Sequence, residues 1–221
     1  MTSIFIFRRD FRLNDNIGLI ECCQSSNKVY PIFIFTPEQI DKNDYKSSNS
    51  VQFMIESLQD LDKNLKKYNS KLHLFYGDYL KVINHLINKL EIDNIFTNTD
   101  YTPYAIKRDN DIEALAKKQD INFFKYHDNC LFEPGTILTG SNSYYQKFTP
   151  FYNQCLKNKF PSTKKLRKKH KTILSKSNEK IFSISFVETG KFFTLNTKLH
   201  IQGGRKKAKK ILKKNKTIQK L

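Results

Sequence analysis

Short apolar runs alternate with longer segments of helical periodicity along residues 1–126. The first apolar run, residues 4–7, has no polar interruption, which is typical of a parallel strand covered on both faces. Four further short runs are also predicted as strands, and Pro31 near the start of the second run is tolerated at that position. The predicted strands cover residues 4–7, 29–35, 71–76, 94–98 and 121–126.

Between these runs, apolar residues at spacings of three and four predict amphipathic helices. The longest of these helices has its apolar positions at Val51, Met54, Ile55, Leu58, Leu61 and Leu65. We expect Asn14 or Asp15 to cap the first helix, and Pro103 to occupy the first turn of the fourth. The predicted helices cover residues 16–23, 50–68, 79–90 and 103–119.

Five strands that alternate with four helices predict an α/β fold. The favoured architecture is a Rossmann-like, doubly wound sheet of five parallel strands, with helices on both faces because crossover connections are right-handed. We assign residues 1–160 to this domain. Residues 161–221 are predicted to form a basic, partly disordered linker or tail. This tail contains one short apolar piece at residues 181–186 and a basic, helix-like run from Gly204.

Charge is distributed unevenly along the 221 residues, whose formal net charge is +18. Residues 1–155 carry 18 Lys+Arg against 19 Asp+Glu, whereas residues 156–221 carry 21 against 2. A basic segment of this density favours a polyanion such as nucleic acid or an acidic membrane surface. A solvated tail without a partner is the alternative interpretation.

Several common site types have no motif in this sequence. The phosphate-binding patterns GxGxxG and GxxxxGK[ST] are absent. The four cysteines, Cys22, Cys23, Cys130 and Cys155, lack the spacing of metal ligands or of a disulfide framework, so we expect reduced thiols and no metal. The N-terminal apolar run is too short for a signal peptide, and no window approaches a membrane span. We therefore expect a soluble, intracellular protein without a membrane partner.

Ligands of open α/β sheets bind beyond the carboxyl ends of the strands, where the strand order switches. The segments that come after the first, second and fourth strands are residues 8–16, 35–37 and 98–103. The first of these segments concentrates three arginines and two aspartates. For Arg12 and Asp15 we expect a structural ion pair, whereas a ligand-facing role and a structural role fit Arg9 and Asp10 equally well.

The segment after the first strand resembles the opening of the DNA photolyase and cryptochrome family. IFIFRRDFRLNDNIGL is similar to a strand that runs into R-x-D-L-R-x-x-D-N. In the same order, residues 98–115 resemble the family's N-x-D-x-x-P-(Y/F)-x-x-x-R-D segment, and residues 140–157 resemble its Y-x-V-F-T-P-F block. TPEQI at 36–40 and EPGTILTG at 133–140 also fit. The resemblance therefore extends over residues 1–160.

This resemblance implies that the α/β domain holds a light-harvesting antenna chromophore, which in some members is a folate, a deazaflavin or a flavin. It also implies that the catalytic FAD and the DNA lesion lie in a separate helical domain. Residues 200–212 resemble the G-G-x-x-x-A-x-x-x-L piece that opens that domain, and the family's electron-relay tryptophans are absent. We therefore expect no catalytic residues in this chain, and FAD only on a missing partner domain.

The expected chromophore site is the crevice at the carboxyl end of the sheet. There Asp100 resembles a position that contacts deazaflavin-type chromophores, through ring N–H groups that donate to a carboxylate. The predicted cofactor-binding residues are Arg9, Asp10, Phe35, Ser48, Val51, Asp100 and Arg108. Ordinary structural explanations are core packing for Phe35 and Val51, a helix cap for Ser48, and an ion pair of Arg108 with Asp109 or Asp111. Taken singly, the ligand role is favoured for Asp100 and Arg9.

Aromatic residues interleave with Lys147 over residues 144–152, a combination that is able to stack on bases. In the family that this chain resembles, the block packs the α/β domain onto the next part of the chain. We therefore favour core packing for this block.

The leading hypothesis is an antenna-type half of a split or truncated photolyase or cryptochrome. Such a half acts in light-dependent DNA repair only with a separately encoded FAD-binding helical half, and it contacts DNA through that partner or through the basic tail. Docking predicts an exposed apolar patch on the α/β domain. The alternatives are a non-catalytic DNA-binding protein that uses the basic tail, and an inactive remnant.

Overall fold

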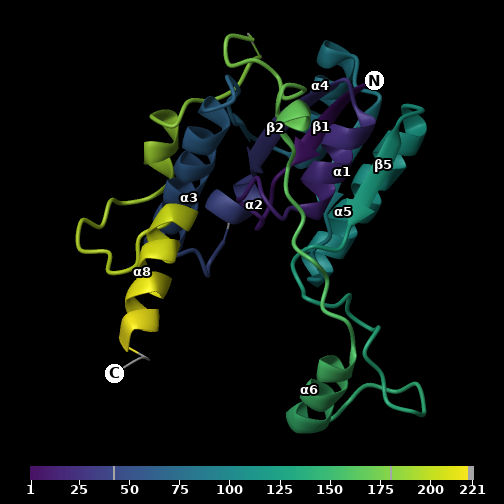
Figure 1. Cartoon of the computed structure of the whole chain (residues 1–221). Coiled ribbons are helices and arrows are strands. Elements are labelled where there is room, and N and C mark those ends of the chain that lie inside the picture. The colour runs from purple at the N-terminus through teal and green to yellow at the C-terminus, as the bar shows by residue number, and fades with distance from the viewer. Residues whose placement is uncertain (42, 180, 219–221) are drawn as a thin grey trace.

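The computed structural model describes residues 1–41, 43–179 and 181–218. At its centre lies a parallel sheet of β1 (Thr2–Ile6), β2 (Lys28–Phe35), β3 (His73–Tyr76), β4 (Asn94–Asn98) and β5 (Asn122–Tyr126). The order of the strands is β3-β2-β1-β4-β5, and β2, β1 and β5 are labelled in Figure 1. In the central strand β1, Ile4 is paired with Tyr30 on one side and with Ile95 on the other. The predicted α/β fold is therefore confirmed.

Helices cover both faces of the sheet and divide its apolar side chains into two cores. The helices α1 (Ile17–Ser25) and α3 (Ser48–Lys66) share one core with Phe5 and Phe7. The helices α4 (Tyr79–Leu90) and α5 (Pro103–Lys118) share the other core with Ile4 and Ile6. Successive residues of the first strand thus face opposite cores, which explains why the run has no polar interruption.

The ends of the first helix differ from the prediction. Asn16 is the N-cap of α1, and its side-chain oxygen accepts a hydrogen bond from the Leu19 amide at 3.0 Å. The prediction of Asn14 or Asp15 as the cap is wrong, because Asp15 takes a left-handed conformation with φ of 57° and belongs to the preceding loop. At α5 the prediction is confirmed, since Thr102 caps the helix and Pro103 lies in its first turn.

The described part of the chain after residue 160 packs against the α/β domain. Leu166, Leu174 and Phe192 are buried in the core that α1 and α3 share. Leu174 forms a bridge to β2, and Ile184, within the predicted apolar piece, forms a bridge to β3. Single apolar residues in a polar context have no periodicity, so the sequence pattern does not reveal these contacts. The helices of this segment are α7 (Lys168–Lys171), the 3-10 helix η1 (Glu188–Phe192) and α8 (Arg205–Ile218).

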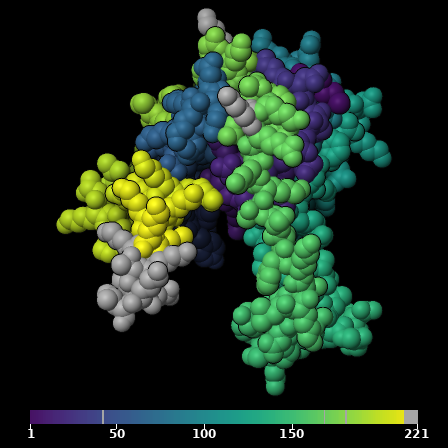
Figure 2. All heavy atoms as spheres, viewed as in Figure 1, coloured from purple at the N-terminus to yellow at the C-terminus, as the bar shows by residue number. Residues whose placement is uncertain are grey.

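Residues 130–160, which we term the arm, project from the body and carry α6 (Phe148–Lys157) (Figures 1 and 2). Phe148 and Tyr152 are 74% and 48% exposed, and their rings stack on one another with centroids 5.8 Å apart. The prediction of core packing for the aromatic block is therefore wrong within the described chain. The arm instead presents apolar surface around a cavity of about 500 Å³.

Candidate functional site

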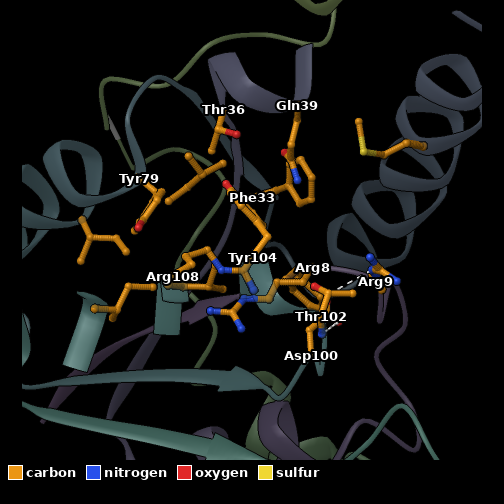
Figure 3. Close-up of a pocket in the computed structure, with 16 residues that line it drawn as sticks. Arg8, Arg9, Phe33, Thr36, Gln39, Tyr79, Asp100, Thr102, Tyr104 and Arg108 are labelled. Atoms are coloured by element: carbon orange, nitrogen blue, oxygen red, sulfur yellow. Dashed lines mark hydrogen bonds and ion pairs between the residues drawn. The ribbon is translucent and has the colours of Figure 1, made fainter. Parts of the chain in front are cut away.

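A cavity of about 200 Å³ lies at the carboxyl end of the sheet (Figure 3). The loops after β1, β2 and β4 form its walls together with α4 and α5. This is the crevice at which the strand order switches, because β1 pairs with β2 on one side and with β4 on the other. Its polar lining residues are Arg8, Arg9, Thr36, Gln39, Tyr79, Asp100, Thr102, Tyr104 and Arg108. Its apolar lining residues are Ile6, Phe7, Phe33, Ile34, Met54, Ile83 and Ile112.

Arg9 and Asp100, the two residues for which a ligand role is favoured, meet at this cavity. Nε of Arg9 lies 3.2 Å from Oδ2 of Asp100 (Figure 3). The Arg9 side chain is 68% exposed, whereas the Asp100 side chain is 12% exposed. An ion pair with such an exposed member contributes little to stability. These two side chains can therefore rearrange around a ligand at a small energetic cost.

Two buried guanidinium groups share one carboxylate beside the cavity. Arg8 contacts both oxygens of Asp109, with Nη2–Oδ1 and Nη1–Oδ2 distances of 2.6 and 2.9 Å. Nε of Arg108 lies 3.4 Å from Oδ1 of the same carboxylate. Of the two expected partners, Asp109 and Asp111, it is therefore Asp109 that pairs with Arg108. Burial, followed by the charge of Arg8, lowers the pKa of Arg108. Two cations against one anion leave positive charge here, which favours an anionic or electron-rich ligand.

Nη2 of Arg8 contacts Asp109, but three other buried polar atoms in the cavity wall have neither a hydrogen-bond partner nor an ion-pair partner among the described residues. They are Oγ1 of Thr36, Oε1 of Gln39 and Nη2 of Arg108. Buried polar groups are nearly always hydrogen-bonded, and an unpaired one costs about 1–3 kcal/mol. The three atoms offer a hydroxyl, an acceptor and a charged donor. These three atoms therefore lie in the wall of one cavity with unused hydrogen-bonding capacity.

Asp10 is not among the residues that line this cavity, and it organises the loop after β1. Its carboxylate accepts hydrogen bonds from the Arg8 amide at 2.8 Å, from Nδ2 of Asn16 at 2.9 Å and from Nδ2 of Asn98. Burial raises the pKa of Asp10, and these hydrogen bonds oppose that rise. Of the two roles left open for Asp10, these contacts support the structural one.

Phe35, Val51 and Ser48 do not line the cavity. Phe35 and Val51 are core residues, in agreement with their structural explanation. Ser48 is the first residue of α3, and the N-cap is Ser47, so the helix-cap assignment is wrong by one position. Oγ of Ser48 accepts a hydrogen bond from the Thr194 amide at 3.3 Å. A ligand contact for these three residues stays a prediction.

The contacts of Arg12 differ from the expected ion pair. Its guanidinium contacts Oδ2 of Asp128 at 2.8 Å and donates a hydrogen bond to the main-chain oxygen of Asp15. The expected partner, Asp15, therefore contributes its main-chain oxygen and not its carboxylate. The result is still a structural role, since Arg12 ties the loop after β1 to the segment after β5.

Thr36, Gln39 and Tyr79 line the cavity but were not singled out by the sequence. Thr36 falls within the segment after β2, so the topological rule points to its neighbourhood without naming it. Gln39 lies on α2 (Pro37–Ile40), which is too short to show periodicity. Tyr79 donates a hydrogen bond to Oδ2 of Asp111 at 2.6 Å, which fixes its ring in the wall.

Among the described residues, no group of three or more His, Cys, Asp or Glu side chains is placed to hold a metal ion. Nor is any helix in that part of the chain both long and apolar enough to cross a membrane.

Residues 3–169 match the sequence profile of a family described as DNA photolyase. A deoxyribodipyrimidine photo-lyase of Synechococcus is 31% identical over 67% of this chain and 31% of its own length. Cryptochrome-1 of Aedes aegypti is 30% identical over 62% of this chain and 26% of its own length. The chain thus spans about a third of these curated relatives or less.

Solved structures show the same fold. An archaeal photolyase from Sulfolobus tokodaii, described as having two FAD molecules and implying a novel light-harvesting cofactor, has a TM-score of 0.80 at 34% identity. The match covers 96% of this chain and 46% of that one. A cryptochrome of Synechocystis has a TM-score of 0.83 at 19% identity, over 96% of this chain and 45% of its own, and shows likeness of fold alone. Since 96% of the chain is covered, the shared fold includes most of the segment after residue 160.

Proposed function

We propose a function from one premise, which is that this chain belongs to the DNA photolyase family. Its α/β domain binds a light-harvesting pigment, a flat conjugated ring of the flavin, deazaflavin or folate type, in the cavity at the carboxyl end of the sheet. The three unpartnered polar atoms of Thr36, Gln39 and Arg108 carry this proposal. The pigment, when bound, supplies the absorption of near-UV or blue light.

The chemistry of the cavity wall fits such a ring. Apolar side chains such as Phe33 and Met54 supply the surface against which a conjugated system packs. Nη2 of Arg108 is available to donate a hydrogen bond to a ring carbonyl, and Oε1 of Gln39 is available to accept one from a ring N–H. Arg8 and Arg108 are only partly neutralised by Asp109, and the remaining positive charge favours an electron-rich ring edge on that side.

Among the three pigments we favour a flavin. The archaeal photolyase at 34% identity is the one described with two FAD molecules and a novel light-harvesting cofactor. The cavity of about 200 Å³ is smaller than the roughly 300–1,000 Å³ typical of drug-sized ligands. We therefore assign the ring to the cavity and the rest of the molecule to the space beyond the Arg9–Asp100 ion pair.

This pigment-binding domain serves light-dependent DNA repair as one half of a larger assembly. We propose that the catalytic FAD belongs to a helical half and that a separately encoded chain supplies this half. Support comes from the arm, because large exposed apolar surfaces mark sites of association. No catalytic residue is assigned to this chain, so bond cleavage belongs to the assembly.

The absorption spectrum tests pigment binding. Purified protein is mixed separately with FAD, a deazaflavin and a folate, and unbound pigment is removed by gel filtration. We expect retention of the flavin band. Loss of a charged donor by Arg108→Met should weaken binding by about 10- to 100-fold, and Gln39→Ala by about 3- to 10-fold, in fluorescence titrations.

The control is Lys118→Met, an exposed position on the same helix, which should bind as the wild type does. Circular dichroism of each variant checks that the fold is retained. Failure to retain any of the three pigments, or wild-type affinity in Arg108→Met, would contradict the proposal.

A further inference from the structure

A groove of about 590 Å³ separates the second half of α3 from the first two turns of α8. Residues 11–14 of the loop after β1 close one side of it. None of the described residues lines both this groove and the pigment cavity. In the described part of the chain, Asp60 is the one carboxylate among its lining residues. The lining cations are Arg12, Lys63, Lys67, Arg205, Lys206 and Lys209.

Most of this positive charge is not neutralised within the described chain. Arg12 is held by Asp128 and is therefore excluded from the balance. Nζ of Lys67 donates a hydrogen bond to the neutral Asn64 side chain at 2.9 Å. Lys67 therefore forms no ion pair with a described carboxylate, and neither do the side chains of Lys63, Arg205, Lys206 and Lys209. Five cations thus remain against Asp60.

Backbone contacts fix the start of α8 against α3. The Gly203 amide donates a hydrogen bond to Oε2 of Glu56 at 2.7 Å, and the Gly204 amide donates one to Oγ of Ser57 at 3.0 Å. A Cβ on Gly203 would lie 2.1 Å from the carbonyl oxygen of Phe53, so only glycine permits this approach. In Figure 1, α8 begins beside α3 and runs away from the sheet. The groove therefore exists before a ligand arrives, which lowers the cost of binding.

We propose that this groove binds the sugar–phosphate backbone of double-helical DNA without regard to base sequence. Lysine, which supplies four of the five available cations, acts as a point charge that neutralises phosphates and lacks the rigid fork with which arginine reads bases. A ridge of phosphates is able to enter a groove, whereas a flat membrane surface is not. No acidic residue occurs anywhere in the sequence of α8 to oppose this contact.

The salt dependence of binding tests this proposal on pigment-free protein in the dark. The probe is a fluorescein-labelled duplex of about 20 base pairs and mixed sequence, roughly two helical turns, and binding is measured by fluorescence anisotropy. Five phosphate contacts predict a slope of about −4.5 for log K against log salt. Affinity should therefore fall by about 500-fold between about 50 and 200 mM salt.

A triple variant locates the contact. Arg205→Gln/Lys206→Gln/Lys209→Gln removes three of the five cations and should reduce the slope to about −2. The matched control, Lys89→Gln/Lys117→Gln/Lys118→Gln, removes the same charge from exposed positions of α4 and α5 on the opposite face of the sheet and should keep the wild-type slope. Circular dichroism confirms the fold of both variants.

Three results would overturn the proposal: no binding of the duplex at about 50 mM salt, a wild-type slope in the groove variant, or binding to phosphatidylserine vesicles in place of the duplex. The assay contains no pigment, so its outcome is independent of the proposed antenna function.

Discussion

His73 on β3 is fully buried, and its Nε2 lies 3.2 Å from Oγ of Ser175. Burial is the main cause that lowers its pKa from 6.5 to about 4, with a further contribution from the charge of Lys71. Between these two pH values the unfolded chain binds a proton at this histidine and the folded chain does not. The stability that neutral His73 supports is therefore complete above pH 6.5 and is lost as the pH falls toward 4.

We expect this histidine alone to remove about 3 kcal/mol from the free energy of unfolding between pH 6.5 and 4. Urea unfolding at a series of pH values measures this loss as the difference between wild type and His73→Asn, whose curve should be flatter. His85→Asn, at an exposed position, should keep the wild-type curve. Parallel curves for wild type and His73→Asn would show that the histidine does not cause the loss.

Residue by residue, the sequence located part of the candidate site. Arg9, Asp100 and Arg108 line the cavity, because Arg9 and Asp100 follow strands and Arg108 lies on α5, and their contact with a ligand stays a prediction. The sequence did not predict Thr36 and Gln39 as site residues, because an unpartnered side chain is a property of three-dimensional packing and leaves no pattern in sequence. The structural role of Asp10 depends on two donors from its own loop and on Asn98 of β4, and the approach of Asn98 to this loop cannot be seen in the sequence.

At the scale of elements, strongly periodic segments were predictable and isolated contacts were not. The helix α4 and the strand β4 begin and end at the predicted residues. In α4, apolar residues at helical spacing lie between Asp78 and Glu91, and in β4 the apolar pair Ile95 and Phe96 lies between Asn94 and Asn98. Leu166, Leu174 and Phe192 complete one core from a segment without such a pattern. Burial of these residues depends on where the chain returns, which local sequence does not encode.

The docking of α8 on α3 depends on the glycine at position 203. Gly203→Ala places a Cβ against the Phe53 carbonyl, so we expect a loss of about 1–3 kcal/mol in this contact and release of the helix. Trypsin should then cleave at the α8 lysines faster than in the wild type, as measured by mass spectrometry of the fragments. Gly190→Ala, where a Cβ meets no atom within 4 Å, is the control. Equal cleavage rates in the two variants would argue against glycine-dependent docking.

For the whole molecule, the projecting arm provides the test of the proposed partner (Figure 2). Affinity purification of the tagged chain from its host should recover a polypeptide that carries the helical half and FAD, identified by mass spectrometry and absorption. Phe148→Ser/Tyr152→Ser should abolish this recovery without changing thermal unfolding, since both side chains are exposed. Phe182→Ser, at an exposed position outside the arm, should not. Undiminished recovery with the arm variant would exclude the arm as the docking surface.

Arg8 and Arg108 both contact the carboxylate of Asp109, and together the three groups carry a net positive charge. This charge gives the cavity a fixed electric field with its positive pole on the side of α5. Excitation by light redistributes electrons within a conjugated ring. Redistribution toward that pole is stabilised and shifts absorption to the red, whereas redistribution away from it shifts absorption to the blue. The colour of the bound pigment would therefore report which edge of the ring faces the two arginines.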